Sequence, residues 1–188
     1  MSHIAGALLV LSDRICHTFH MEIIETIKDA DLGLPFADGG VYQERRASRA
    51  VVFDEDGKIA LLYAAKKHFH KLPGGGIEGT ESIEEALRRE VSEEIGCTIR
   101  NIRELGIVEE FRNKFMLHQL SYCFLADLAG EKGVPHFEPS EIEDGFVPVW
   151  LDIEEAIRTL EGETDIEDYE GKFVRVRDLA FLQKAAQG

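Results

Sequence analysis

The stretch of residues 75–97 constrains this chain more than any other, because it sets glycines and charged residues at fixed intervals. Its defining residues are, in chain order, Gly75, Glu81, Arg89, Glu90, Glu93, Glu94 and Gly96. At about 100° per residue, Glu90, Glu93 and Glu94 fall on one side of a helix, as neighbours three and four positions apart. The spacing therefore predicts a helix with one acidic side.

Both ends of this helix carry recognisable signals. Ser82 can cap the first turn, and Glu85 three residues later completes a capping box. Gly96 is suited to end the helix in the left-handed conformation. An apolar stripe adjoins the acidic side and is expected to seat the helix on a core. The stripe consists of Ile83, Leu87 and Val91.

Three neighbouring carboxylates repel one another, and a hard cation between them relieves that repulsion. Ligands that are all oxygen atoms favour magnesium or manganese over zinc. The preceding residues 73–76, Pro-Gly-Gly-Gly, let the backbone approach closely, so a peptide carbonyl can join the metal ligands. Cations beside a glycine loop suit a phosphate substrate, because they neutralise its charge and activate water.

This spacing resembles the Nudix box, with Val91 and Cys97 at its two apolar positions. The resemblance implies the Nudix fold, which is an α/β/α sandwich with a mixed sheet, and a pyrophosphohydrolase activity. The competing interpretation is a solvated acidic helix. That interpretation explains the glutamates, but it leaves Gly75, Arg89 and Gly96 at these intervals unexplained.

The resemblance also implies roles for the residues of the box. Glu90 and Glu94 are expected to bind the divalent cations, with the Gly75 carbonyl as a further ligand. Glu93 is expected to be a ligand or the general base. Arg89 is expected to orient the neighbouring carboxylates, together with Glu81, since a guanidinium can hold a carboxylate through two hydrogen bonds.

The attacking group is expected to be water, because no Ser-His or Cys-His pair at a recognisable spacing supports a covalent route. Its proton needs a carboxylate within hydrogen-bond reach. Glu93 is one candidate for this base. The other is an acid in the stretch before Trp150, where Glu143 is preferred. The acids of that stretch are Glu141, Glu143 and Asp144.

The basic side chains are concentrated between residues 45 and 71, although the whole chain has a net charge of −15. Arg46, Arg49 and Lys71 are expected to contact substrate phosphates, and Phe69 to stack on a base or ribose. The acidic total argues against a protein that binds long nucleic acid through its phosphates. The partner is therefore expected to be a small substrate derived from a nucleotide.

The 188 residues suit one domain with an extension. Residues 1–40 are interpreted as an N-terminal extension, partly disordered or forming a homodimer contact, and residues 41–188 as the Nudix domain. Met21 is a candidate for the true start, and residues 38–40 for a turn. A strand or turn is expected at 22–28, and strands at 47–53, 58–65, 98–112 with a bulge at Gly106, 115–128 at the centre of the sheet, and 146–151. Helices are expected at 152–160, capped by Asp152 with Glu155 at the third position, and at 172–186. A polar loop is expected at 129–144 and a mobile acidic segment at 161–170.

The three cysteines are too far apart to form a metal or redox pattern. Cys16, Cys97 and Cys123 are therefore expected to be reduced thiols, which indicates a cytoplasmic protein. No apolar run reaches the length of a membrane span, and the short apolar stretch near the N-terminus lacks a basic flank before it.

The preferred function is Mg²⁺- or Mn²⁺-dependent hydrolysis of the diphosphate bond in a nucleoside diphosphate linked to another group. ADP-ribose, other nucleotide sugars and nucleoside triphosphates are all compatible with the box. The main alternative is a nucleotide-binding regulatory module of the same fold that does not hydrolyse its ligand. A calcium-binding EF-hand is disfavoured because the sequence lacks an Asp-x-Asp-x-Asp-Gly loop. An isomerase of allylic diphosphates is disfavoured because it would have a degenerate box and a catalytic cysteine, whereas Cys97 occupies an apolar position of the box.

Overall fold

The structure is a computed structural model that describes residues 21–36 and 39–188. The predictions made for residues 1–20, for Cys16 and for the part of the 38–40 turn at Asp38 lie outside the described residues.

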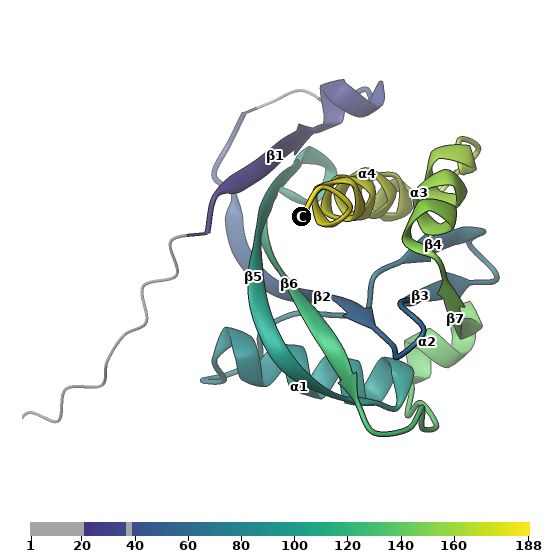
Figure 1. The fold of residues 1–188 in the computed structure, drawn as a ribbon. Coiled ribbons are helices and arrows are strands. Elements are labelled where there is room, and N and C mark those ends of the chain that lie inside the picture. The colour runs from purple at the N-terminus through teal and green to yellow at the C-terminus, as the bar shows by residue number, and fades with distance from the viewer. Residues whose placement is uncertain (1–20, 37–38) are drawn as a thin grey trace, which may run out of the picture.

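A mixed sheet of seven strands forms the centre of the molecule (Figure 1). The strands are β1 (Ile23–Lys28), β2 (Gln43–Phe53), β3 (Ile59–Ala64), β4 (Phe69–Lys71), β5 (Thr98–Arg112), β6 (Leu117–Ala129) and β7 (Phe146–Leu151). Their order is β1-β5-β6-β2-β3-β4, and β7 pairs with β3. β1 runs parallel to β5 and β2 parallel to β6, while the other pairs are antiparallel. The predicted mixed sheet, with 115–128 as a central strand, is confirmed.

Helices cover both faces of this sheet (Figure 1). The helices are α1 (Ile83–Ile95), α2 (Pro139–Asp144), α3 (Ile153–Gly162) and α4 (Tyr169–Ala185), with short 3-10 turns η1 (Asp29–Leu32) and η2 (Asn113–Phe115). Leu87 and Val91 of α1 pack on one face, whereas Phe173 and Phe181 of α4 fill the core on the other. The predicted α/β/α sandwich is therefore confirmed.

The signals that delimit α1 behave as predicted. The Ser82 side chain accepts a hydrogen bond from the Glu85 amide, and Glu85 in turn accepts one from the Ser82 amide. Gly96 ends the helix with φ 66°, in the left-handed region, and its amide donates to the Ser92 carbonyl. These caps fix the start and end of the helix, and so they fix which side of it carries the glutamates.

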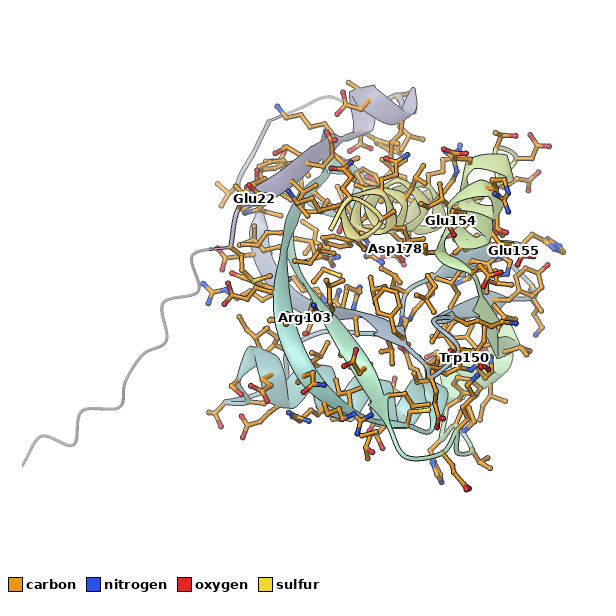
Figure 2. All side chains as sticks on the ribbon, in the orientation of Figure 1. Glu22, Arg103, Trp150, Glu154, Glu155 and Asp178 are labelled. Carbon is orange, nitrogen blue, oxygen red and sulfur yellow. The ribbon has the colours of Figure 1, made fainter. Side chains whose placement is uncertain are left out.

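Three local predictions are wrong, and two of them concern the starts of helices. Residues 129–144 are not one loop, because α2 forms at their end, with Pro139 as its first residue and a capping box between Glu138 and Glu141. Asp152 precedes α3 without a side-chain capping bond, and Glu155 lies on the outer side of that helix (Figure 2).

The acidic segment 161–170 is held by contacts rather than extended into solvent. Its first residues belong to α3 and its last two to α4. Between them, Ile166 is buried, and the Glu163 carboxylate accepts hydrogen bonds from the His70 amide and ring. The segment therefore packs against β4.

Residues 21–36, which belong to the predicted extension, contribute β1 to the same sheet. β1 pairs with β5, and Ile27 is buried in the core on the α4 side. Cys97 and Cys123 are buried free thiols, as predicted for these two. Within the described ranges, no helix combines the length and hydropathy that a membrane span needs.

Candidate active site

The glycine loop of residues 73–76 lies against β2 and contacts the second half of α1 through Arg89, Glu90 and Glu94. The Ser48 amide donates to the Gly75 carbonyl at 2.9 Å, and the Ala50 amide donates to the Pro73 carbonyl at 3.0 Å. A Cβ on Gly75 would meet the Glu90 carboxylate oxygen at 2.1 Å. Glycine is therefore needed for Glu90 to reach the backbone at this corner.

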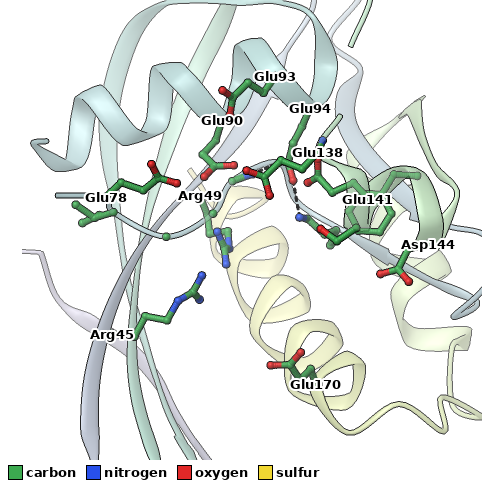
Figure 3. Close-up of a pocket in the computed structure, with 17 residues that line it drawn as sticks. Arg45, Arg49, Glu78, Glu90, Glu93, Glu94, Glu138, Glu141, Asp144 and Glu170 are labelled. Atoms are coloured by element: carbon green, nitrogen blue, oxygen red, sulfur yellow. Dashed lines mark hydrogen bonds and ion pairs between the residues drawn. The ribbon is translucent and has the colours of Figure 1, made fainter. Parts of the chain in front are cut away.

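A cleft of about 530 Å³ opens at this corner (Figure 3). One wall is formed by α1 with the three glutamates, and another by α2, while β2 and β4 supply basic side chains. The charged side chains that line it include Glu90, Glu93, Glu94, Arg45, Arg49, Lys71 and Glu141. The structure therefore brings most of the predicted metal and phosphate ligands into one cleft.

Arg89 connects the acidic residues of the box. Its guanidinium donates to both Glu81 oxygens at 2.8 and 3.3 Å, to Glu90 at 2.8 Å and to Glu93 at 3.2 Å. It also donates to the Gly76 carbonyl at 3.0 Å, which ties α1 to the glycine loop. These hydrogen bonds raise the pKa of Arg89 and hold the pKa of Glu81 below its usual range.

Among the three box glutamates that line the cleft, Glu94 is the most buried, with a side chain that is 1% exposed. One oxygen accepts from the Lys71 ammonium at 2.6 Å, and the other accepts from the Gly74 amide at 2.5 Å. Burial raises the pKa of Glu94 to about 7, against the opposing effect of Lys71. Burial and the neighbouring Glu94 also raise the pKa of Glu90, against the effect of Arg89.

The ligand types here fit a hard divalent cation. Glu90 and Glu94 provide carboxylate oxygens that burial and mutual repulsion make costly to ionise, and a cation would lower that cost. The Gly75 carbonyl accepts one hydrogen bond and keeps a second lone pair. Among residues 21–36 and 39–188, however, no three acidic, His or Cys side chains are close enough to hold an ion together. Arg89 and Lys71 bind the carboxylates instead.

Two predicted site residues, Arg46 and Glu143, are exposed and do not line the cleft. Arg46 is 58% exposed and pairs with Glu44 at 2.9 Å, because alternate residues of a strand point to opposite faces. Arg45 takes its place, on the same face as Arg49. Glu143 lies on the exposed side of α2, whereas Glu141, two positions earlier on this short helix, lines the cleft.

Phe69 is also not in the cleft. Its ring is 5% exposed and packs with Ile166 and against Gly171. It lines a smaller neighbouring pocket, together with Arg112 and Arg177. The predicted stacking on a base or ribose is wrong for the cleft, because the ring belongs to the packing between β4 and α4.

The part of the site that sequence reasoning missed is a set of buried charges beneath the cleft. Asp178 of α4 accepts from the Leu72 amide at 2.8 Å and pairs with Arg177 at 2.7 Å (Figure 2). Glu110 of β5 pairs with Arg112 at 3.0 Å. The two pairs lie on α4 and β5, more than 60 positions apart in the sequence, and fit no local motif, so no sequence signal pointed to their meeting.

A family model described as the NUDIX domain matches residues 43–176. Among curated proteins, the ADP-ribose pyrophosphatase of Methanocaldococcus jannaschii is 32% identical over 82 residues. The matched stretch covers 42% of this chain and 48% of that protein, so it spans about half of the relative's length.

Two solved structures of MutT proteins resemble this fold. A structure from a study of MutT from Aliivibrio salmonicida and Vibrio cholerae superposes on this chain with a TM-score of 0.51 at 21% identity. The match covers 78% of this chain and 100% of that chain. The MutT NUDIX hydrolase of Burkholderia pseudomallei gives a TM-score of 0.50 at 21% identity, covering 72% and 98%. At this identity the likeness shows the fold, and it agrees with the predicted sandwich.

Proposed function

Because this chain belongs to the NUDIX family, we propose that it hydrolyses the diphosphate bond of a nucleoside diphosphate linked to another group, with the help of a divalent cation. One observation carries the proposal: Glu90 and Glu94 meet the Gly75 corner in a cleft that also contains Lys71 and Arg49. Acidic ligands and phosphate-binding cations are thus side by side, as a charged diphosphate requires.

Glu90, Glu94 and the Gly75 carbonyl would hold the cation, with Glu93 as a further ligand or as the base. When bound, Mg²⁺ or Mn²⁺ would offset the diphosphate charge and favour ionisation of an attacking water. Lys71 would contact the diphosphate oxygens, and Arg49 also lines this cleft. Arg89 would keep Glu90 and Glu93 in place through the bonds described above.

Two carboxylates of the cleft are candidates to accept the proton from water. The Glu93 side chain is 39% exposed and accepts a hydrogen bond from Arg89 at 3.2 Å. Glu141 lines the opposite wall and lies close enough to Glu94 to influence its pKa. We assign the base to Glu93 or Glu141, in place of the Glu143 preferred from the sequence.

The products would be a nucleoside monophosphate and a phosphorylated remainder. ADP-ribose is the first substrate to test, because the archaeal relative is an ADP-ribose pyrophosphatase. A cytoplasmic location and a homodimer formed through the N-terminal residues stay predictions. Size-exclusion chromatography with light scattering tests the second of these.

A panel of substrates tests the proposal. ADP-ribose, other nucleotide sugars, dinucleoside polyphosphates and nucleoside triphosphates are incubated with Mg²⁺ or Mn²⁺, and the products are separated by chromatography. We expect one class to be cleaved, and Glu90→Gln to lower the rate by on the order of 100-fold or more. Glu84→Gln, an exposed change on the same helix, is the matched control. Binding of every substrate without cleavage would favour the regulatory alternative.

A further inference from the structure

A second pocket of about 270 Å³ adjoins the cleft, and its charged lining is mainly basic. Arg45, Arg49 and Lys71 line both spaces, so the two are neighbours. Arg112 of β5 and Arg177 of α4 line only the second space. We call this second space the basic pocket.

Most cations of the basic pocket are already neutralised. Arg112 pairs with Glu110 at 3.0 Å and with Glu170 at 3.2 Å. Arg177 pairs with Asp178 at 2.7 Å, and Lys71 pairs with Glu94 at 2.6 Å, as described above. Lys67, which also lines this pocket, pairs with Asp144 at 2.7 Å.

Arg49 differs from these cations. Its side chain is 5% exposed, and in the described parts of the chain it forms no ion pair. Its Nη1 donates to the Ser48 carbonyl at 3.0 Å, while its Nε has no hydrogen-bond partner. Burial, with Arg177 nearby, lowers the pKa of Arg49 to about 9. A buried guanidinium with no ion pair and an unsatisfied Nε is costly, and the attraction of Asp178 and Glu94 offsets only part of that cost, which favours a ligand that supplies the missing charge.

Among the cations that line the basic pocket, Arg45 is the second that forms no ion pair with a described residue. Its Nη1 donates to the Gln119 side chain at 2.6 Å. Partial desolvation of its guanidinium and the nearby Arg112 lower its pKa, although the residue as a whole is exposed. Arg45 and Arg49 lie on the same face of β2, four residues apart, so their guanidinium groups face the same space (Figure 3).

We propose that the basic pocket binds a phosphomonoester that the substrate carries in addition to its diphosphate. This inference rests on the proposed function, since it names the class of substrate for the same site. Two guanidinium groups without acidic partners balance the charge of a phosphomonoester, which is about −2 at neutral pH. Their planar forks also match phosphate oxygens through paired hydrogen bonds.

The aromatic rings of the pocket are less suited to a nucleobase. Lys71 lies 4.9 Å above the ring of Phe146, and Phe69 is buried against α4. The pocket is therefore better matched to an anion than to a flat uncharged ring.

Matched substrate pairs test the proposed class. NAD⁺ with NADP⁺, and dephospho-coenzyme A with coenzyme A, each differ by one phosphomonoester. We expect kcat/KM to favour the phosphorylated member of at least one pair by about tenfold, the effect of one charged hydrogen bond. Arg45→Gln should abolish that preference, whereas Arg46→Gln should retain it because Arg46 lies outside both pockets.

A binding measurement without metal separates this inference from the proposed function. Inorganic phosphate and ribose 5-phosphate are titrated by calorimetry at low salt. We expect both to bind the wild type and Arg46→Gln, and to bind Arg45→Gln about tenfold more weakly. Equal binding by the wild type and Arg45→Gln would overturn the anion site, even if no diphosphate were cleaved. Equal kcat/KM within both substrate pairs would overturn the assignment of phosphomonoester substrates.

Discussion

The Lys71 ammonium lies 2.6 Å from Oε1 of Glu94, and this pair joins β4 to the acidic side of α1. The side chains are 15% and 1% exposed, so the pair is largely removed from water. The Gly74 amide donates to the other Glu94 oxygen. The deepest carboxylate of the cleft is thus held by one cation and by the glycine loop.

Lys71→Met tests this pair. Removing the ammonium leaves a buried carboxylate without a cation, which should lower the free energy of unfolding by about 3 kcal/mol at about pH 8.5. The pKa of Glu94 is raised to about 7 in the folded protein. Its contribution to the free energy of unfolding is therefore fully present below the pKa of the unfolded chain and is lost as the pH rises through about 7. The loss caused by Lys71→Met should therefore be smaller at about pH 5.5, where Glu94 is protonated.

Urea unfolding of the metal-free protein at the two pH values measures this difference. Lys66→Met, a change at an exposed neighbouring lysine, is the control. A loss of equal size at both pH values would show that Glu94 does not respond to Lys71.

Gly75→Ala tests the close contact at the corner. The new Cβ would lie 2.1 Å from the Glu90 oxygen, so the carboxylate must move away. We expect kcat/KM to fall on the order of 100-fold, because small displacements of a reacting group are costly. Gly162→Ala meets no atom within 4 Å and is the control. Activity of Gly75→Ala near that of the control would mean that the position of Glu90 is not critical.

Arg89→Lys tests the connecting guanidinium. A lysine keeps the charge but cannot hold Glu81, Glu90 and Glu93 at once through a planar fork. We expect about a tenfold loss of kcat/KM and a higher Mg²⁺ concentration for half-maximal rate. Arg88→Lys, at the neighbouring arginine that binds Glu84, provides the comparison. Similar kinetics for the two variants would remove the orienting role of Arg89.

Glu141→Gln and Glu143→Gln form a matched pair on α2. Glu141 lines the cleft and Glu143 does not, so only the first should lower kcat, by about tenfold or more if it takes the proton. Steady-state kinetics at saturating Mg²⁺ measure the effect, with Glu93→Gln assayed in parallel. If Glu143→Gln lost as much activity as Glu141→Gln, the orientation of α2 would be wrong.

The helix of the box could be predicted because its determinants are local. Ser82, Glu85 and Gly96 fix its ends, and the repeat of 3.6 residues per turn then places Glu90 and Glu94 on one side. The central position of β6 was predictable from its apolar faces. These predictions depend only on residues that are close in the sequence, and the structure confirms them.

The errors arose where orientation depends on an element that was not recognised. Pro139 and the Glu138–Glu141 spacing signal a helix start, and that helix decides that Glu141 rather than Glu143 faces the cleft. In a strand, successive side chains point to opposite faces, so Arg46 lies on the other face from Arg45 and Arg49. This rule could have been applied to the sequence, and it would have replaced Arg46 by Arg45.

The buried charges could not be predicted from the sequence. Glu110 and Arg177 lie on β5 and α4, and their proximity results from the packing of that helix on the sheet. A contact between such distant residues follows from tertiary structure alone. For the same reason the burial of Arg49 was not foreseen, although the residue itself was expected to contact substrate.

A crystal soaked in manganese, with anomalous diffraction data, tests the central claim most directly. We predict an anomalous peak between Glu90, Glu94 and the Gly75 carbonyl, with Glu94 turned from Lys71 toward the ion. If manganese occupied other sites while Glu90 stayed on Arg89 and Glu94 stayed on Lys71, the cleft would not be a metal-dependent diphosphatase site.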